Sequence, residues 1–147
     1  MKKGVILGLA VLFFGTICTA QTGSVPGNIR LLPGFVHHRG QGIDSMVGSI
    51  TRKDGLVIQY DIGKAAGVYT DCEWCGWTDG ELWRRSQIVG GHEVRIVLTK
   101  SKRLVISFPD APANFYATIG SDADLTDTLL MVLTYSPPLA AKIGRFP

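Results

Sequence analysis

The sequence predicts an α+β fold, an antiparallel β-sheet meander of about six to seven strands with one C-terminal helix packed on it. Short segments of alternating apolar and polar residues follow one another along the chain, and this is the period of a strand with one buried face. Glycine-containing turns separate these segments, as hairpins require. A single apolar stripe with helical spacing follows the last strand segment.

The first twenty residues have the pattern of a secretory signal peptide. Lys2 and Lys3 precede an apolar run over residues 5–14, and mostly small residues lead to a cleavage site after Ala20. The run is well short of the roughly 20 residues that a spanning helix needs, and the large Ile17 before Cys18 disfavours a lipoprotein. We therefore expect export to the periplasm or the extracellular space, with no membrane span after signal cleavage.

Cleavage would divide the chain into a signal peptide (1–20), a lead-in segment rich in Gly and Pro (21–34), a single α+β domain (35–136) and a C-terminal tail (137–147). The whole chain of 147 residues has 15 basic and 12 acidic side chains. Without the signal peptide and its two lysines, 127 residues remain with 13 basic and 12 acidic side chains, a net charge of +1. We expect no nucleic-acid partner, because that function normally uses a strong positive field.

The first hairpin is predicted over residues 46–62, where Asp54-Gly55 suits the tight turn between two alternating segments. Successive residues of a strand point to opposite faces, so Gln59 and Asp61 of the second strand belong to the face opposite its inward residues. We therefore expect a layer that covers one side of the sheet. The inward face of the second strand consists of Leu56, Ile58, Tyr60 and Ile62.

A second hairpin is predicted over residues 83–99, because Gly90-Gly91 relieves the steric cost of positive φ in its turn. Further strands are expected at 104–108, which Pro109 ends, and at 114–119. The inward residues of these strands are expected to be Val94, Ile96, Leu98, Leu104, Ile106, Phe108, Phe115, Ala117 and Ile119.

The helix is predicted to begin after Ser121, a good N-cap, with Asp122 and Asp124 in the first turn near the positive end of the helix dipole. Pro137-Pro138 would end it. Its apolar stripe consists of Leu125, Leu129, Val132 and Leu133, and we expect this stripe to cover the inner face of the sheet.

The segments Gly-Ile-Asp-Ser-Met-Val-Gly-Ser-Ile at 42–50 and Ile-Gln-Tyr-Asp-Ile-Gly at 58–63 resemble a pattern found in small exported bacterial proteins of uncharacterised function. This resemblance implies no activity. The order of antiparallel strands followed by a C-terminal helix is also similar to the PsbP and Mog1 type of sandwich, an analogy of fold only.

Cys72 and Cys75 form the most specific local motif, Cys-Glu-Trp-Cys. Gly76 replaces the histidine that covalent haem attachment needs, and a redox site would need a cysteine at a helix N-terminus. A zinc site would need two further ligands, for which His37, His38 and His92 are available. In an oxidising compartment we favour a Cys72–Cys75 disulfide that stiffens the loop, and we expect no cofactor.

Aromatic residues surround this motif, and a stiff loop that presents them would suit recognition. The alternative is that the tryptophans cap an open edge of the core. The candidate binding residues are Tyr69, Trp74, Trp77 and Trp83.

Catalytic candidates are His37, His38 and His92, together with Asp44 beside Ser45. Adjacent histidines on a strand point to opposite faces, and Asp44-Ser45 fits a turn better than a nucleophile elbow. Basic residues also gather in the second half of the chain, where a solvated face competes with weak binding to an anionic polymer or lipid. These are Arg84, Arg85, Arg95, Lys100, Lys102 and Arg103.

The sequence thus favours a non-catalytic binding or interaction module that uses the aromatic loop, with an unidentified envelope or extracellular protein or polymer as partner. The competing interpretation is a small extracytoplasmic enzyme or a metal or redox protein. That protein would use His37, His38, Asp44 or His92, or the cysteine pair.

Overall fold

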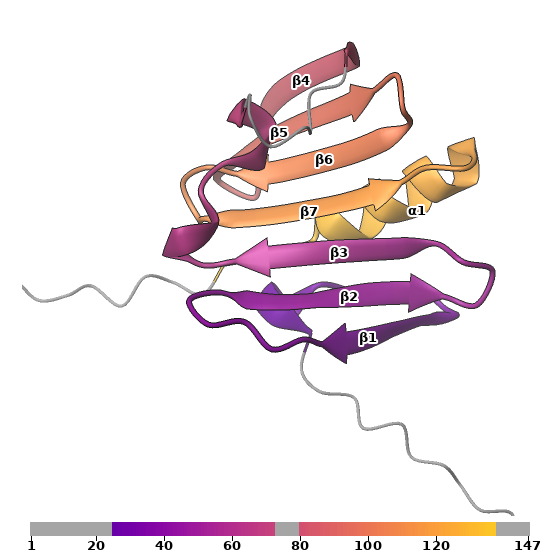
Figure 1. The fold of residues 1–147 in the computed structure, drawn as a ribbon, viewed down its shortest axis with the longest axis horizontal. Coiled ribbons are helices and arrows are strands. Elements are labelled where there is room, and N and C mark those ends of the chain that lie inside the picture. The colour runs from indigo at the N-terminus through magenta and orange to yellow at the C-terminus, as the bar shows by residue number, and fades with distance from the viewer. Residues whose placement is uncertain (1–24, 73–79, 138–147) are drawn as a thin grey trace, which may run out of the picture.

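A computed structural model describes residues 25–72 and 80–137, in which seven antiparallel strands form one sheet and a single helix lies on one of its faces (Figure 1). The helix is α1 (Asp122–Val132), and the short 3₁₀ helices are η1 (Pro26–Asn28), η2 (Lys64–Ala66) and η3 (Tyr69–Asp71). The strands are β1 (Phe35–Arg39), β2 (Met46–Arg52), β3 (Val57–Ile62), β4 (Glu81–Val89), β5 (His92–Thr99), β6 (Arg103–Phe108) and β7 (Ala113–Thr118). The predicted antiparallel sheet with one C-terminal helix is confirmed.

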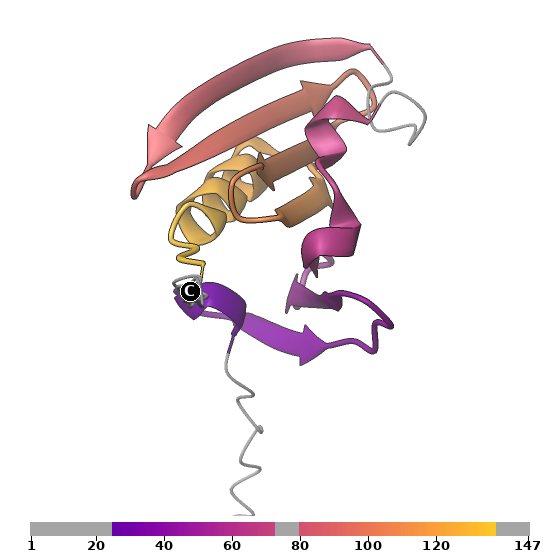
Figure 2. The same cartoon turned by 90° about the vertical axis from the view of Figure 1, so that its left-hand side faces the viewer.

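The predicted meander is wrong in one respect, because the strands do not follow one another across the sheet in sequence order. The order is β1-β2-β3-β7-β6-β5-β4, so two meanders, β1 to β3 and β4 to β7, join through antiparallel pairing of β3 with β7. After β3 the chain runs through η2 and η3 across one face of the sheet, which we call the open face, and reaches β4 at the far edge (Figure 2). We call the opposite face, on which α1 lies, the helix face.

Both predicted hairpins form at their predicted turns. The first pairs β2 with β3, and Gly55 in its turn has a φ of 108°. In the second, Val89 pairs with His92 across Gly90 and Gly91, whose φ values of 59° and 89° are both positive. That pattern belongs to the primed two-residue turn, whose twist matches the twist of the strands.

The main core lies between the helix face and α1, and it contains nearly all of the residues predicted to point inward. Tyr135, which follows α1, closes the core with its ring centroid 4.9 Å from that of Phe108 and 5.3 Å from that of Phe115. The lead-in contributes the buried Ile29. It also packs Gly27 against the Tyr135 ring, where an added Cβ would overlap the ring.

Helix α1 begins where the sequence predicts, with the Ser121 hydroxyl accepting a hydrogen bond from the Asp124 amide at 3.2 Å. It ends at Val132, five residues before Pro137, and its most buried side chains are Thr128, Met131 and Val132. The predicted stripe is therefore offset, because Leu125 and Leu129 are only partly buried.

An arginine ties the helix to the sheet. Arg52 of β2 donates to Asp124 and to Asp127 of α1, both at 2.5 Å. These two bonds connect the first meander to the covering layer, because β2 and α1 are far apart in the sequence.

A second, smaller core lies on the open face, for which the sequence predicts no covering layer. Val97 and Val105 are fully buried there, since η3 packs over β5 and β6. Val57 of β3, on the same face but away from η3, is exposed. The open face is therefore divided into a part covered by η3 and a part accessible to solvent.

Gly48 of β2 allows close packing across the first meander. The Tyr60 hydroxyl lies over it, and an added Cβ at position 48 would overlap that hydroxyl and the His38 carbonyl oxygen. The same hydroxyl is 2.8 Å from His37 Nε2, and Tyr60 is 1% exposed. A glycine is needed here for space and not for backbone conformation.

We predict that Gly48→Ala lowers the free energy of unfolding by about 1–3 kcal/mol, the usual cost of overpacking a core. Urea unfolding checks this, with Ser49→Ala on the neighbouring position as the control. Equal stabilities for the two variants would contradict the steric argument.

Candidate functional site

The histidines that the sequence offers as catalytic candidates lie apart. His37 Nε2 is 2.8 Å from the Tyr60 hydroxyl on the helix face, whereas His38 points to the other side, with Nε2 3.0 Å from Thr51 Oγ1. His92 Nδ1 is 3.0 Å from Asp110 Oδ2 near the turn that follows β4. Asp44 lies in an exposed bend before β2, so these residues do not form one site.

The predicted aromatic binding residues are also distributed. Tyr69 lies in η3 on the open face, while Trp83 of β4 pairs with Leu98 and shares the helix face with it. Trp74, Trp77 and Cys75 lie outside the described residues. The Cys72–Cys75 disulfide and the aromatic loop therefore stay predictions.

Within residues 25–72 and 80–137, no three His, Cys, Asp or Glu side chains are close enough together to hold a metal ion. In the same ranges there is no helix with the length and apolar character needed to cross a membrane.

The open face brings together polar residues from both meanders. Asn114 of β7 is fully buried and accepts hydrogen bonds from the Tyr69 amide at 3.0 Å and from the Ser107 hydroxyl at 2.7 Å. Its amide nitrogen donates to the Gly67 carbonyl at 3.1 Å. These bonds satisfy the buried amide and fix η3 to the sheet.

Asp61, Tyr69 and Tyr116 form a cluster beside this anchor. The Tyr69 hydroxyl donates to Asp61 Oδ2 at 2.6 Å, and the rings of Tyr69 and Tyr116 are 5.9 Å apart. Burial, together with the bond to the Asp61 carboxylate, raises the pKa of Tyr69 far above its usual value. Burial and the charge of Asp61 also raise the pKa of Tyr116, so both phenols stay neutral and remain hydrogen-bond donors at physiological pH.

The other oxygen of Asp61, Oδ1, is buried without a hydrogen-bond partner among the described residues. Buried carboxylate oxygens are normally satisfied. The cluster therefore has acceptor capacity that the described residues do not use.

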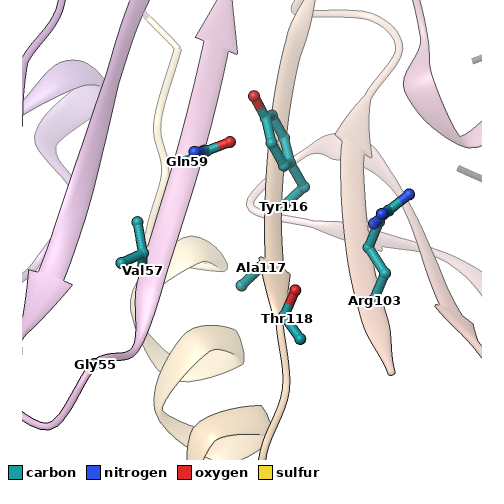
Figure 3. A pocket seen from close by; sticks show the side chains of 7 residues that line it. All are labelled: Gly55, Val57, Gln59, Arg103, Tyr116, Ala117 and Thr118. Atoms are coloured by element: carbon teal, nitrogen blue, oxygen red, sulfur yellow. The ribbon is translucent and has the colours of Figure 1, made fainter. Parts of the chain in front are cut away.

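A trough of about 460 Å³ continues from Tyr116 across β3, β7 and β6 on the exposed part of the open face (Figure 3). Gln59 and Tyr116 are cross-strand neighbours, as are Arg103 and Thr118. The trough thus presents an amide, a phenol, a guanidinium and a hydroxyl over a partly apolar floor. Its lining residues are Gly55, Val57, Gln59, Arg103, Tyr116, Ala117 and Thr118.

Two arginines on the open face bind carboxylates and backbone near η3. Arg84 bonds Glu81 and the Thr70 carbonyl and lies 3.6 Å from Asp71, and Arg95 bonds Asp71 and Glu93. Two of the predicted basic residues therefore serve to hold η3 to β4 and β5. Among the described residues, the lining of the trough contains Arg103 and no carboxylate.

The sequence predicts Tyr69 as a binding residue but not the residues that it meets. Gln59 and Asp61 lie, as predicted, on the face opposite the main core, and this shared face is the sequence signal for a polar site. Tyr116 lies between the inward Phe115 and Ala117 and so belongs to the same face. Only the pairing of β3 with β7 shows that these residues meet.

The chain shows no significant match to protein-family models, to curated proteins or to solved structures.

We predict that Asn114→Ala lowers the free energy of unfolding by about 3 kcal/mol, because it leaves buried partners unsatisfied. Hydrogen exchange at the Tyr69 amide should accelerate as η3 loosens. Thr118→Ala, an exposed position on the same strand, is the control and should change stability by less than about 0.5 kcal/mol. An unchanged exchange rate at Tyr69 would contradict the anchoring role of Asn114.

We also predict that the protein loses stability as the pH rises above about 10, the ordinary tyrosine pKa. The pKa values of Tyr60, Tyr69, Tyr116 and Tyr135 are all raised, chiefly by burial. A tyrosine whose pKa is raised in the folded state stabilises the fold at any pH below its unfolded-state pKa. This stabilisation is lost as the pH rises through the folded-state pKa. Phenolate absorbance of the folded protein should appear above pH 10 and shift to ordinary values in urea. Ordinary titration of all four tyrosines in the folded state would refute the prediction.

Proposed function

We propose that this chain is an exported, non-catalytic binding domain that takes a segment of an acidic polysaccharide in the trough on the open face. The observation that carries the proposal is the composition of the trough, whose described lining residues supply one guanidinium, several uncharged hydrogen-bonding groups and no carboxylate. Export is inferred from the signal peptide pattern.

The chemistry of the lining suits a sugar chain. The Gln59 amide and the Thr118 hydroxyl offer both donors and acceptors, and the Tyr116 ring offers an apolar surface at which its neutral hydroxyl remains a donor. Arg103 supplies the charge for a carboxylate, which a guanidinium binds through two parallel hydrogen bonds.

The shape favours a polymer segment over a small enclosed substrate. The trough lies on an exposed sheet surface, with Val57 40% exposed at its wall, whereas enclosed ligand sites bury most of their ligand. A repeating chain gains affinity from many weak contacts along such a surface.

The proposal is tested by nuclear magnetic resonance titration of the protein with an oligogalacturonate and with a neutral maltooligosaccharide of equal length. We expect the acidic chain to shift the amide signals of residues 55–59 and 116–118, with an affinity that falls as salt is added. Arg103→Gln should weaken this binding by about tenfold, the usual effect of losing a charge-assisted hydrogen bond.

Arg30→Gln is the matched control, because it removes the same charge from an exposed position in the lead-in, outside the lining of the trough. Equal binding of the neutral chain, equal effects of the two substitutions or shifts confined to other surfaces would each reject the proposal.

A further inference from the structure

Strand β4 is the last strand at one side of the described sheet. It pairs only with β5, and among the described residues no other strand extends the sheet beyond it. Eight of its nine residues are exposed and Val89 is half-buried. In an antiparallel sheet every second residue of an edge strand directs its amide and carbonyl outward, so β4 has a row of backbone donors and acceptors that no other described strand uses.

Its exposed apolar side chains distinguish this edge from a well-protected one. Leu82 is 60% exposed, Trp83 37% and Ile88 70%. Natural edges are usually shielded by charges, prolines or bulges. Here the register shift between Glu81 and Trp83 disrupts only the start of the strand, which leaves residues 83–89 regular.

The charges on β4 provide little shielding. Arg84 is held on the open face by Glu81, Asp71 and the Thr70 carbonyl, so its charge is compensated within the same molecule. Arg85 has no ion pair among the described residues and lies on the helix face, where its register partner is Ile96. One uncompensated cation therefore remains on the regular part of the edge.

We propose that β4 is the interface through which two copies of this chain associate, with the two β4 strands pairing antiparallel about a two-fold axis at Ser86. Such an axis is perpendicular to the sheet, keeps both helix faces on the same side and extends the sheet to two copies of seven strands. Residues that lie directly opposite each other in such a sheet share a face. The axis must therefore pass between one residue and the same residue of the other copy, and it cannot pass midway between two successive residues.

The side chains select the register centred on Ser86. It places Arg85 opposite Gln87, whose side-chain carbonyl accepts a hydrogen bond, and Trp83 opposite Val89, an aromatic pair with a β-branched residue. It also places the exposed Ile88 opposite Arg84, since both residues lie on the open face. A register centred on Arg85 or on Arg84 would instead bring two identical arginines face to face, which is unfavourable.

The backbone agrees with this choice. In the β4–β5 hairpin the residues that flank the turn, Val89 and His92, pair with each other, and pairing to β5 alternates from there. Val89, Gln87 and Arg85 therefore direct their amides and carbonyls toward β5, whereas Ser86 directs its amide and carbonyl away from β5, to the free edge of the strand. Ser86 of one copy is therefore in position to pair with Ser86 of the other.

The association is tested by sedimentation of the purified protein over a range of concentrations. One pair of strands makes a small interface, so we expect a monomer–dimer equilibrium in the micromolar to millimolar range. Ser86→Pro removes the outward amide and should abolish the dimer, while Ser86→Ala should retain it. An edge strand tolerates proline where the amide faces solvent, and equal melting temperatures would show that the fold is intact.

Cross-linking tests the register and does not depend on the proline variant. Opposed residues in an antiparallel pair lie within disulfide range, so Ser86→Cys should form a disulfide between positions 86 of two copies, identified by mass spectrometry. Arg85→Cys and Gln87→Cys should each cross-link at least tenfold less on their own and should cross-link to each other when mixed.

A protein that stays monomeric to millimolar concentration would overturn the proposal, as would a dimer unaffected by Ser86→Pro or equal cross-linking at 85, 86 and 87. A monomer that instead binds an extended peptide along β4 would also overturn it, because the partner would then not be a second copy. None of these outcomes bears on the trough, which lies on β3, β7 and β6.

Discussion

The antiparallel pairing of β3 with β7 is the interaction on which the rest of the structure depends. Five residue pairs, from Ile58 with Ala117 to Ile62 with Ala113, join two meanders that are otherwise local. Without it there would be two small sheets, each with an unpaired edge beside the helix. Because these strands are far apart in the sequence, the pairing carries a large loop-closure cost, and it is repaid by the main core, which spans both meanders.

The same pairing determines what happens on the open face. Since β7 occupies the position beside β3, the chain that leaves β3 must travel to the far edge before it can pair again. The route through η2 and η3 crosses β6 and β5. Ser107 of β6 and Asn114 of β7 supply buried hydrogen bonds for this backbone, which is not part of the sheet. One strand pairing therefore accounts for the second core, for the polar cluster around Asp61 and for the exposed trough beside it.

Local features of the fold could be predicted from the sequence, because alternation, turn glycines and the Ser121 cap act within a few residues. The strand order could not, since no local pattern distinguishes β7 from β4 as the neighbour of β3. The second core has a sequence signal of its own. Ile96-Val97-Leu98 and Leu104-Val105-Ile106 are apolar on consecutive positions, which is typical of strands covered on both faces. For the site, residue type and face were predictable, but the meeting of Asp61 with Tyr116 depended on that long-range pairing.

The contact between the lead-in and the segment after α1 has a mechanical consequence. The Ser136 amide donates to the Gly27 carbonyl at 2.7 Å, and Gly27 packs against the Tyr135 ring, so the two ends of the described body lie side by side. Tension applied between these ends would first load this contact, the bond from the Arg30 amide to the Thr134 hydroxyl at 2.9 Å and the packing of Ile29 in the core. The next element to bear the load would be β1, which follows the lead-in and is held in the described sheet only by its pairing with β2.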